Sequence, residues 1–557
     1  MLFLPLRLAA SSRRPEYVKF RLSGDPPYRR VRAPRWRLFR RSDPAAVQSL
    51  ETLRRQIEQL GRDRRVRGII FEVDGLEISP AKRDAMTALF DHARRAGKQV
   101  LGYGVTVSNA EYELLCAADR IYVPAAGRVD LTGFAAEISA VGRALSRVGI
   151  RAHFIRRGDY KTAPELFTRE DVSPIQRETV ESILDERYRY LIQAIARGRR
   201  MSEADARARI DRGPFSARRA LAEGLIDGLC SEPELPQLLA PGGRPPKRDG
   251  SPPEARVGTY PDYLATVVLP PIAWPRLRPR PRLGVVSLNG MIAEGRGGTF
   301  PAGPVIAGSW SVMAALDEAR RNPRIPAVVL YVSSPGGSAP ASEMILEAVR
   351  RLAAKKPVVG YFDRVAASGG YMAVCGAKEV WAGRGAIAGS IGVFAGKFDA
   401  GGLFERLGVN REILTRGQNA GLQSPARPFT EHERSSLEAE VEEIYQSFLE
   451  IVATARRRTK DEVHARGEGR VYSADRALDA GLVDRVGGFD EACRRALELA
   501  GRSPKGPFEV ALFGARPPRL GLLGMFRQWS GTQLLALWYP WISLDGNSAG
   551  WGGAVEP

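Results

Sequence analysis

Apolar runs and helical patterns alternate along the chain in the same order twice. Each copy begins with a short, β-branched apolar run, continues with a helical pattern and returns to a second apolar run. The segments are Arg67–Asp74, Ala81–Ala96 and Gln99–Gly104 in the first copy, and Pro326–Ser333, Ser342–Ala354 and Pro357–Phe362 in the second. Strands that alternate with helices predict an α/β fold with buried parallel or mixed sheets.

Further matches indicate that the chain is an internal duplication. Tyr112–Tyr122 matches Tyr371–Trp381 with an offset of 259 positions. Near the end of each copy, Ala220–Asp227 (ALAEGLID) matches Ala477–Asp484 (ALDAGLVD) with an offset of 257. The two copies therefore predict two β/α units of one architecture. The chain is divided into an N-terminal segment (1–16), a first repeat (17–231), a Pro/Arg-rich connector (232–281), a second repeat (282–503) and an apolar, aromatic C-terminal tail (504–557).

The composition excludes several classes of protein. A chain of 557 residues that is 44% hydrophobic is neither disordered throughout nor a polytopic membrane protein. Four cysteines without a CxxC pair exclude a disulfide scaffold and argue against a zinc ribbon. We find no metal or nucleotide motif, so we expect no metal site and no cofactor.

The net charge of +20 is the one feature of the composition that is unusual for a globular protein. Much of the excess lies in the connector and in Arg29–Arg41, where few aromatic residues accompany the basic ones. Single-strand binders need such aromatic platforms, so we interpret the charge as solvated linker and surface and expect no nucleic-acid partner. An anionic membrane surface is the other partner that the charge allows.

Neither end of the chain has the pattern of a membrane-spanning segment. Met1–Ala10 is apolar, but it is interrupted and far shorter than the roughly 20 residues that a span needs. Leu520–Leu544 is rich in leucine and tryptophan, and polar residues interrupt it. This pattern favours an interfacial segment over one that spans a membrane. Packing on this chain or on a neighbouring subunit explains such a tail at least as often as a membrane surface does.

Two glycine-rich turns occur in the second copy only. Ser333–Ser338 (SSPGGS) follows a predicted strand, and consecutive glycines there allow backbone N–H groups to point into a cleft. Ala366–Tyr371 (AASGGY) places Ser368 at a strand-to-helix turn, where a hydroxyl is exposed. Asn109 occupies the position equivalent to Ser368 in the first copy.

The first copy carries a lysine that the second lacks. Arg157–Lys161 (RGDYK) aligns with Arg416–Ala420 (RGQNA), so Lys161 stands opposite Ala420. A serine needs a base, and a buried, neutral lysine can serve as one. None of the four histidines lies in a recognisable catalytic motif. Each copy therefore lacks the residue that the other copy has kept. This pattern is expected if both repeats contribute to a single composite active site.

These motifs, together with GSIGV at Gly389–Val393, resemble those of signal peptide peptidases of the long, tandem-repeat type (protease IV), which are serine proteases with a Ser–Lys dyad. The resemblance covers about Tyr17 to Gly501. It implies two tandem ββα-superhelix repeats of the crotonase/Clp-protease type. The implied site residues are Ser368 as nucleophile, Lys161 as general base from the other repeat, Gly336, Gly337 and Gly369 as sources of oxyanion N–H groups, and Ser390 as the hydroxyl that orients the lysine.

The resemblance also implies substrates and surroundings. Substrates would be extended, hydrophobic peptides such as cleaved signal peptides, and the protein would be a homotetramer at the bacterial inner membrane. Long family members begin with a membrane anchor that is not visible here, so a soluble location is the alternative. The rival functions are a crotonase-type acyl-CoA enzyme, a non-catalytic scaffold at a membrane surface and, ranked last, a nucleic-acid binder.

Overall fold

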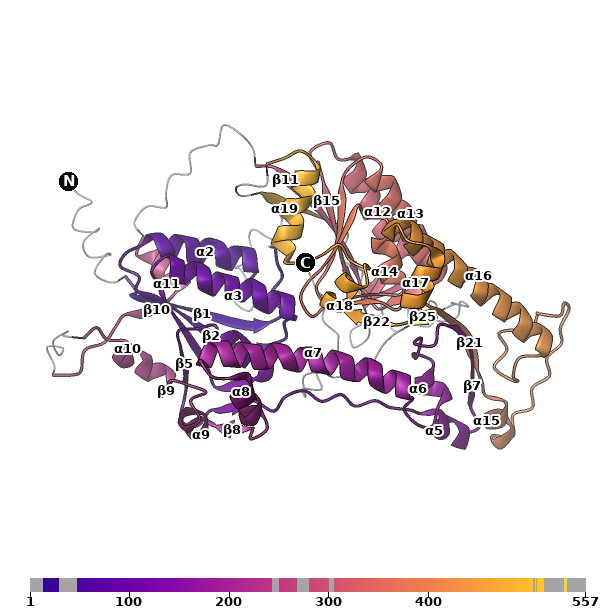
Figure 1. Ribbon diagram of the computed structural model, residues 1–557, viewed down its shortest axis with the longest axis horizontal. Coiled ribbons are helices and arrows are strands. Elements are labelled where there is room, and N and C mark those ends of the chain that lie inside the picture. The colour runs from indigo at the N-terminus through magenta and orange to yellow at the C-terminus, as the bar shows by residue number, and fades with distance from the viewer. Residues whose placement is uncertain are drawn as a thin grey trace. The chain divides into compact units, whose positions relative to one another are not determined.

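The computed structural model describes residues 14–29, 48–242, 250–267, 280–299, 305–503, 506 and 508–514, and the backbone of 535–537 (Figure 1). The chain forms two compact units. Unit 1 contains Met1–Phe134 and Arg187–Pro279, and unit 2 contains Ala135–Glu186 and Arg280–Pro557. The segment Ala135–Glu186, which precedes the connector in the sequence, therefore belongs to the same unit as the second repeat.

A six-stranded parallel sheet forms the centre of unit 1. Its strands, in spatial order, are β10 (Val257–Thr259), β1 (Tyr17–Gly24), β2 (Gly68–Leu76), β3 (Gln99–Gly104), β5 (Arg120–Val123) and β9 (Gly228–Leu229). Helices α2 (Leu50–Arg62) and α3 (Pro80–Arg95) lie side by side on one face (Figure 1). Helix α3 begins where Ser79 accepts a hydrogen bond from Lys82 N, and it buries Met86, Leu89 and Phe90.

Shorter elements complete unit 1. A three-stranded sheet has the order β4, β6, β8, and short helices follow most of its strands. The elements are β4 (Thr106–Ser108), α4 (Asn109–Leu115), β6 (Arg128–Asp130), α8 (Glu203–Ile210), β8 (Phe215–Ser216), α9 (Ala217–Ala222), the 3-10 helix η2 (Glu232–Glu234), α10 (Leu235–Leu238) and α11 (Tyr260–Ala265). Helix α7 (Pro174–Arg199) begins in unit 2 and ends in unit 1.

Unit 2 contains a six-stranded parallel sheet with the same strand order. The strands are β24 (Glu509–Phe513), β11 (Arg282–Asn289), β15 (Val328–Ser333), β17 (Val358–Phe362), β19 (Glu379–Ala382) and β23 (Arg485–Val486). Every residue of β15 is buried, as the apolar run VVLYVS predicts. Helices α12 (Ser309–Arg321) and α13 (Ala339–Ala353) cover one face, and α19 (Phe489–Leu499) covers the other (Figure 1).

The two sheets confirm the expected duplication and the α/β fold class. Shifting β4, β5 and β6 by 259 positions gives the bounds of β18 (Val365–Ala367), β19 and β20 (Ile387–Gly389). Strand β20 lies between β18 and β22 (Val471–Ser473), as β6 lies between β4 and β8. The sequence offset is therefore also a structural offset.

Three further parts of unit 2 position the candidate site. An antiparallel ribbon joins β7 (Arg151–Arg157) to β21 (Val393–Asp399). A five-stranded sheet has the order β13, β14, β12, β16, β25. Its strands are β13 (Gly297–Thr299), β14 (Val305–Gly308), β12 (Met291–Ala293), β16 (Gly336–Ser338) and β25 (Leu535–Leu537). The remaining helices are α5 (Gly142–Arg147), α6 (Glu165–Thr168), α14 (Gly369–Val374), α15 (Gly401–Arg406), α16 (Glu431–Arg456), α17 (Lys460–Arg466) and α18 (Ala474–Asp479).

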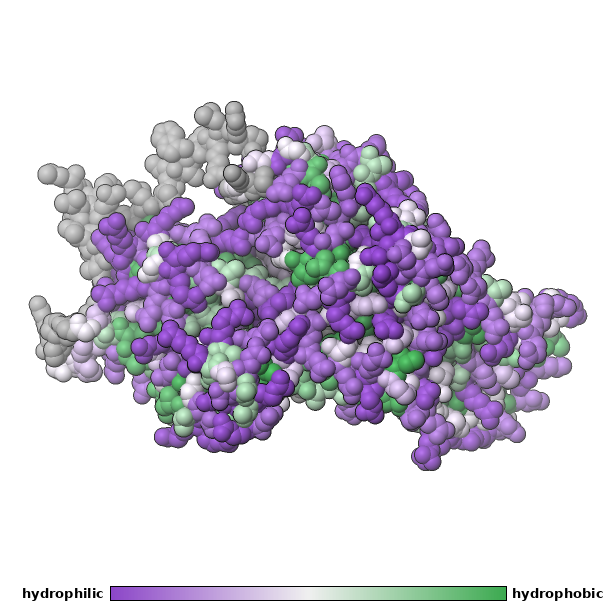
Figure 2. All heavy atoms as spheres, in the orientation of Figure 1, coloured by the Kyte–Doolittle hydropathy of each residue, from purple (hydrophilic) through white to green (hydrophobic). Residues whose placement is uncertain are grey.

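Hydrophilic residues cover most of the face shown in Figure 2 in both units. Among the described residues, no helix combines the length and apolar character that crossing a bilayer requires. Met1–Ala10 lies outside the described residues, as does the proposed membrane-surface segment Leu520–Leu544 except for the backbone of β25.

Candidate active site

Ser368 lies at the junction between β18 and α14. It is fully buried, and its N–H donates to Gly389 O at 2.8 Å. Its φ of 52° and ψ of −122° are unusual for a residue with a Cβ, at a cost of about 1–3 kcal/mol. The turn is tightly packed, because a Cβ on Gly370 would lie 2.8 Å from Ser334 O. Backbone strain in such a setting is typical of a functional residue.

The β7–β21 ribbon brings Lys161 to Ser368. Arg157, the last residue of β7, pairs with Val393, the first residue of β21, so the turns that extend from these two ends lie together. Lys161 is fully buried, and its Nζ lies 3.0 Å from Ser368 Oγ. It also lies 3.0 Å from both the Oγ and the carbonyl oxygen of Ser390. Three side chains predicted from the sequence therefore meet at one buried point.

The environment of Lys161 changes its protonation. Burial lowers the pKa of Lys161 to about 7, because the ammonium form loses its solvation there. Near neutral pH a large fraction of the side chain is therefore a neutral amine. A neutral amine beside a serine hydroxyl can accept its proton, which an ordinary lysine cannot do at this pH.

The backbone setting of Ser390 is similar to that of Ser368. It is fully buried, has φ 54°, and donates its N–H to Arg470 O at 2.7 Å. Its side chain and carbonyl both accept from Lys161, so they limit the directions in which the amine can point.

The two glycines of the SPGG turn adopt backbone conformations that other residues avoid. Gly336 has φ 106° and Gly337 has φ 152°. A Cβ on Gly337 would lie 2.0 Å from Ile292 O, so the close approach of β16 to β12 requires glycine. The Gly336 N–H donates to Ser334 Oγ at 3.2 Å and is therefore already engaged.

Gly369 packs directly against helix α13. A Cβ on Gly369 would lie 2.1 Å from Ser342 Oγ, which itself donates to Ser338 O at 2.8 Å. Gly369 is also the first residue of α14, and N–H groups in a first helical turn lack intrahelical acceptors. The AASGGY turn and the strand that carries the SPGG turn thus share the Ser342 contact.

Sequence reasoning missed a second segment that holds the lysine, Gly467–Arg470, which we call the GEGR segment. A Cβ on Gly469 (φ 80°) would lie 2.3 Å from Lys161 N. Tyr160 N donates to Glu468 O at 2.7 Å, and the Arg470 guanidinium lies 3.8 Å from the centre of the Tyr160 ring. The two glycines predict a turn, but no sequence pattern indicates that this turn contacts Lys161.

Neither the cysteines nor a metal cluster provides a second reactive centre among the described residues. All four cysteines are buried, and none of them forms a disulfide bond with another. Burial raises the pKa of Cys116 to about 12 and that of Cys375 to about 11, so both thiols stay protonated and unreactive. No group of three or more histidine, cysteine or acidic side chains in the described part of the chain could hold a metal ion.

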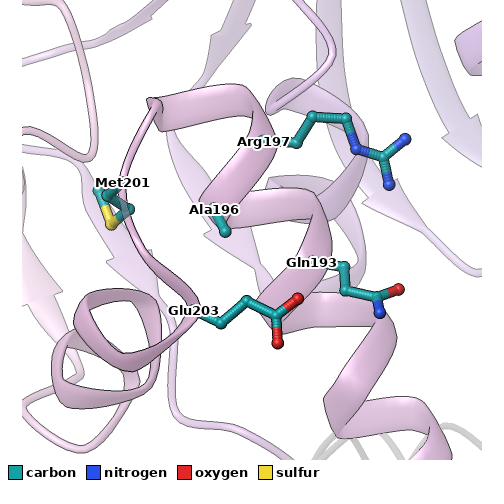
Figure 3. A pocket seen from close by; sticks show the side chains of 5 residues that line it. All are labelled: Gln193, Ala196, Arg197, Met201 and Glu203. Atoms are coloured by element: carbon teal, nitrogen blue, oxygen red, sulfur yellow. The ribbon is translucent and has the colours of Figure 1, made fainter.

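Unit 1 has an open hollow where α7 ends. Gln193, Ala196 and Arg197 of α7 line it together with Met201 and Glu203 (Figure 3). It contains a guanidinium and a carboxylate, but no hydroxyl, thiol or imidazole group. We therefore assign no covalent chemistry to it.

The chain is similar to a peptidase family and to individual proteases. The model of peptidase family S49 matches residues 92–240 and 350–503. Protease 4 of Salmonella typhi is 30% identical over 470 residues, which cover 82% of this chain and 73% of that protein. The chloroplastic serine protease SPPA of Arabidopsis thaliana is 26% identical over 453 residues, which cover 81% of this chain and 66% of that protein. Among solved structures, ClpP1 from Listeria monocytogenes is 12% identical, with a TM-score of 0.24 over 37% of this chain and 91% of that one.

Proposed function

The chain belongs to peptidase family S49, and from that premise we propose that it is a serine endopeptidase in which Ser368 is the nucleophile and Lys161 the general base. The observation that carries these roles is the 3.0 Å separation between Lys161 Nζ and Ser368 Oγ in a buried setting. The lowered pKa of Lys161 supports them, because the amine can act as a base near neutral pH. The family match favours neither an acyl-CoA enzyme nor a non-catalytic scaffold.

Acylation follows from this geometry. As Ser368 Oγ attacks the carbonyl carbon of the scissile peptide bond, Lys161 Nζ accepts the hydroxyl proton. The carbonyl oxygen becomes an oxyanion, for which the N–H groups of Gly337 and Gly369 are our candidate donors. We prefer Gly337 to Gly336, whose N–H already donates to Ser334 Oγ. The Lys161 ammonium then protonates the leaving amine, the C–N bond breaks, and an ester on Ser368 remains.

Deacylation uses the same groups. Water attacks the ester while Lys161 takes one of its protons, and that proton passes to Ser368 Oγ as the ester bond breaks. Ser390 acts as a positioning residue, because its two oxygens accept hydrogen bonds from Lys161 Nζ and hold it toward Ser368.

Peptide substrates follow from membership of a peptidase family. We propose further that they are extended and hydrophobic, such as cleaved signal peptides, as the resemblance to signal peptide peptidases implies. Assembly as a homotetramer and association with the bacterial inner membrane belong to the same proposal. Both are tested by measuring the mass of the particle and its pelleting with anionic vesicles.

The catalytic roles are tested with a fluorogenic hydrophobic peptide. Ser368→Ala and Lys161→Met should each lower kcat/KM by at least about 1,000-fold, since each removes a reacting group. Lys356→Met is the matched control. Burial also lowers the pKa of Lys356, but its Nζ donates to Ala319 O and Asn322 O, away from the dyad. An active Lys161→Met enzyme would exclude the lysine base.

A serine-directed covalent probe provides a second readout. The wild-type protein should be labelled at Ser368, as located by mass spectrometry, and Lys161→Met should be labelled far more slowly. Labelling at another serine with equal rates in both proteins would contradict the assignment.

A further inference from the structure

The GEGR segment bonds to the turns on both sides of the candidate dyad. Glu468 O accepts a hydrogen bond at 2.7 Å from Tyr160 N, and Tyr160 directly precedes Lys161. Arg470 O accepts one at 2.7 Å from Ser390 N. The lysine amine and the serine oxygens that accept its hydrogen bonds are thus carried by two turns that share one short partner segment. A shift of the GEGR segment would move both turns.

The backbone of this segment is strained at Glu468. Its φ of 51° lies in the left-handed region, which residues with a Cβ rarely adopt. The lysine turn packs directly on it, because a Cβ on Gly158 would lie 2.4 Å from the carbonyl carbon of Glu468. A strained residue keeps its conformation only where the surrounding structure holds it. The groups that hold Glu468 therefore influence where Lys161 lies.

Two side chains from neighbouring helices hold Glu468. Tyr445 of α16 places its hydroxyl 2.8 Å from Nδ1 of His464 on α17. His464 Nε2 lies 3.7 Å from Glu468 Oε1, and the Tyr445 hydroxyl also interacts with the backbone of Glu468. Burial raises the pKa of Tyr445 to about 12, so its hydroxyl stays protonated and can donate to Nδ1. The ring proton then lies on Nε2, on the side of the carboxylate. We call these three residues the Tyr–His–Glu trio.

Unit 1 has an equivalent trio without the strain. Shifting α7 by 257 positions gives the bounds of α16, and the same shift relates Tyr188, Arg207 and Asp211 to the Tyr–His–Glu trio. The Arg207 guanidinium lies 5.3 Å from the centre of the Tyr188 ring, and the Tyr188 side chain hydrogen-bonds to Asp211. Asp211, however, has a helical φ of −63°. Both repeats thus contain the trio, and in unit 2 it ends on a strained residue beside the lysine turn.

We propose that Tyr445 and His464 are positioning residues for Lys161, which act by holding Glu468 and the GEGR segment against the lysine turn. The inference rests on the proposed function and identifies what keeps its general base in place. Loosening the trio displaces the amine from the serine hydroxyl. Because the lysine acts in the chemical step, kcat should fall while KM stays nearly unchanged.

The first test is steady-state kinetics on a fluorogenic hydrophobic peptide. Tyr445→Phe removes only the hydroxyl and should lower kcat about threefold to tenfold, with KM unchanged. His464→Ala should lower kcat at least as far. His464→Arg, which introduces the residue of the unit 1 trio, should recover most of that loss.

Unit 1 provides the matched controls. Tyr188→Phe and Arg207→Ala remove the equivalent groups from its trio. The melting temperatures of these variants should fall about as far as those of the unit 2 variants, while kcat stays within about twofold of wild type. An equal kcat in Tyr445→Phe and Tyr188→Phe would overturn the positioning role.

Amide hydrogen exchange separates this inference from the proposed chemistry. In the Ser368→Ala background, peptides that contain the amides of Tyr160 and Ser390 should exchange about tenfold faster when His464→Ala is added, and at an unchanged rate when Arg207→Ala is added. Equal exchange in these two proteins would overturn the positioning role, even if the wild type hydrolyses peptides. Faster exchange with His464→Ala alone, in a protein whose wild type hydrolyses no peptide, would support the positioning role of the trio and overturn the peptidase chemistry.

Discussion

Asn109 in unit 1 and Ser368 in unit 2 occupy the same junction between a strand and a helix, 259 positions apart. In unit 1, Ser108 caps α4 with φ −73° and forms a capping box with Glu111. In unit 2, α14 begins one position later, Ser368 itself is the residue before the helix, and its side chain makes no capping bond. The first repeat therefore starts this helix with a capped serine of ordinary φ. The second repeat has a serine with a strained backbone, and its side chain forms no capping hydrogen bond.

The third residue of each junction also differs between the two units. Glu111 corresponds to Gly370, and its carboxylate accepts hydrogen bonds from Leu76 N and Ser108 N. In unit 2 a Cβ on Gly370 would lie 2.8 Å from Ser334 O, so no such side chain fits. Unit 1 therefore uses the Glu111 carboxylate as the acceptor for Ser108 N, whereas in unit 2 the equivalent Ala367 N donates to the backbone oxygen of Ser334.

The side chains of Asn109 and Ser368 also have different partners. Its amide accepts from Thr132 N at 3.1 Å and donates to Gly133 O at 2.7 Å, whereas Ser368 Oγ faces Lys161. In unit 1 the polar groups at this junction are therefore paired with one another. In unit 2 the same framework buries a hydroxyl beside an amine, as the proposed chemistry requires.

Apart from replacement of Ser368 or Lys161 itself, the largest effect should come from adding one methyl group beside the lysine backbone. Gly469→Ala places a Cβ where Lys161 N lies 2.3 Å away, so the lysine must shift. A misplacement of about 1 Å can cost about 100-fold in rate, so we expect kcat to fall about 100-fold with little change in KM. Steady-state kinetics on a fluorogenic peptide measures this.

Gly501→Ala is the matched control for that change. Gly501 also has a positive φ, 67°, but a Cβ there would meet nothing within 4 Å. Both variants share the strain of a left-handed alanine, about 1 kcal/mol, and only Gly469→Ala displaces the lysine. Equal activity of the two variants, with similar melting temperatures, would show that the GEGR segment does not position Lys161.

The next effect is the pH dependence of the reaction. Protonated Lys161 cannot accept the Ser368 proton, and the pKa of Lys161 is about 7. Lowering the pH below this value should therefore reduce kcat/KM about tenfold per pH unit, and raising it should lead to a plateau. The profile is measured with an uncharged peptide substrate. A flat profile between about pH 6 and 9 would contradict a lysine base.

Ser390→Ala should have a smaller effect of about tenfold in kcat, equivalent to about 1.4 kcal/mol. The variant loses the Oγ contact to Lys161 and keeps the carbonyl contact, each at 3.0 Å. An acceptor that bonds to the ammonium favours the charged form, so its removal should also move the midpoint of the pH profile to lower pH. A slower enzyme with an unmoved midpoint would assign Ser390 to packing alone.

The framework of both repeats could be predicted from sequence, because strand and helix patterns and the 259-position offset are local, repeated signals. Ser368 and Lys161 emerged from asymmetries between the copies and from a family resemblance. The close packing of Gly469 against the backbone of Lys161 could not be predicted. The two residues lie in segments that are distant in the chain, and no sequence pattern links these segments. The same holds for the pairing of Arg157 with Val393, which places Lys161 in the compact unit that contains Ser368.

The smallest effect on activity is expected at Asn109, the counterpart of the nucleophile. Asn109→Ala removes two hydrogen bonds, to Thr132 N and Gly133 O, and should destabilise unit 1 by about 1–2 kcal/mol. The melting temperature of this unit should fall by about 2–6 °C, while kcat/KM changes by less than about twofold. Calorimetry and the peptide assay on the same sample measure both. Ser368→Ala should give the opposite result, an inactive protein whose melting temperature is unchanged or higher, because alanine lacks the buried hydroxyl. If Asn109→Ala instead lost activity without loss of stability, its junction would take part in the reaction, and the contrast between a structural and a reactive repeat would be wrong.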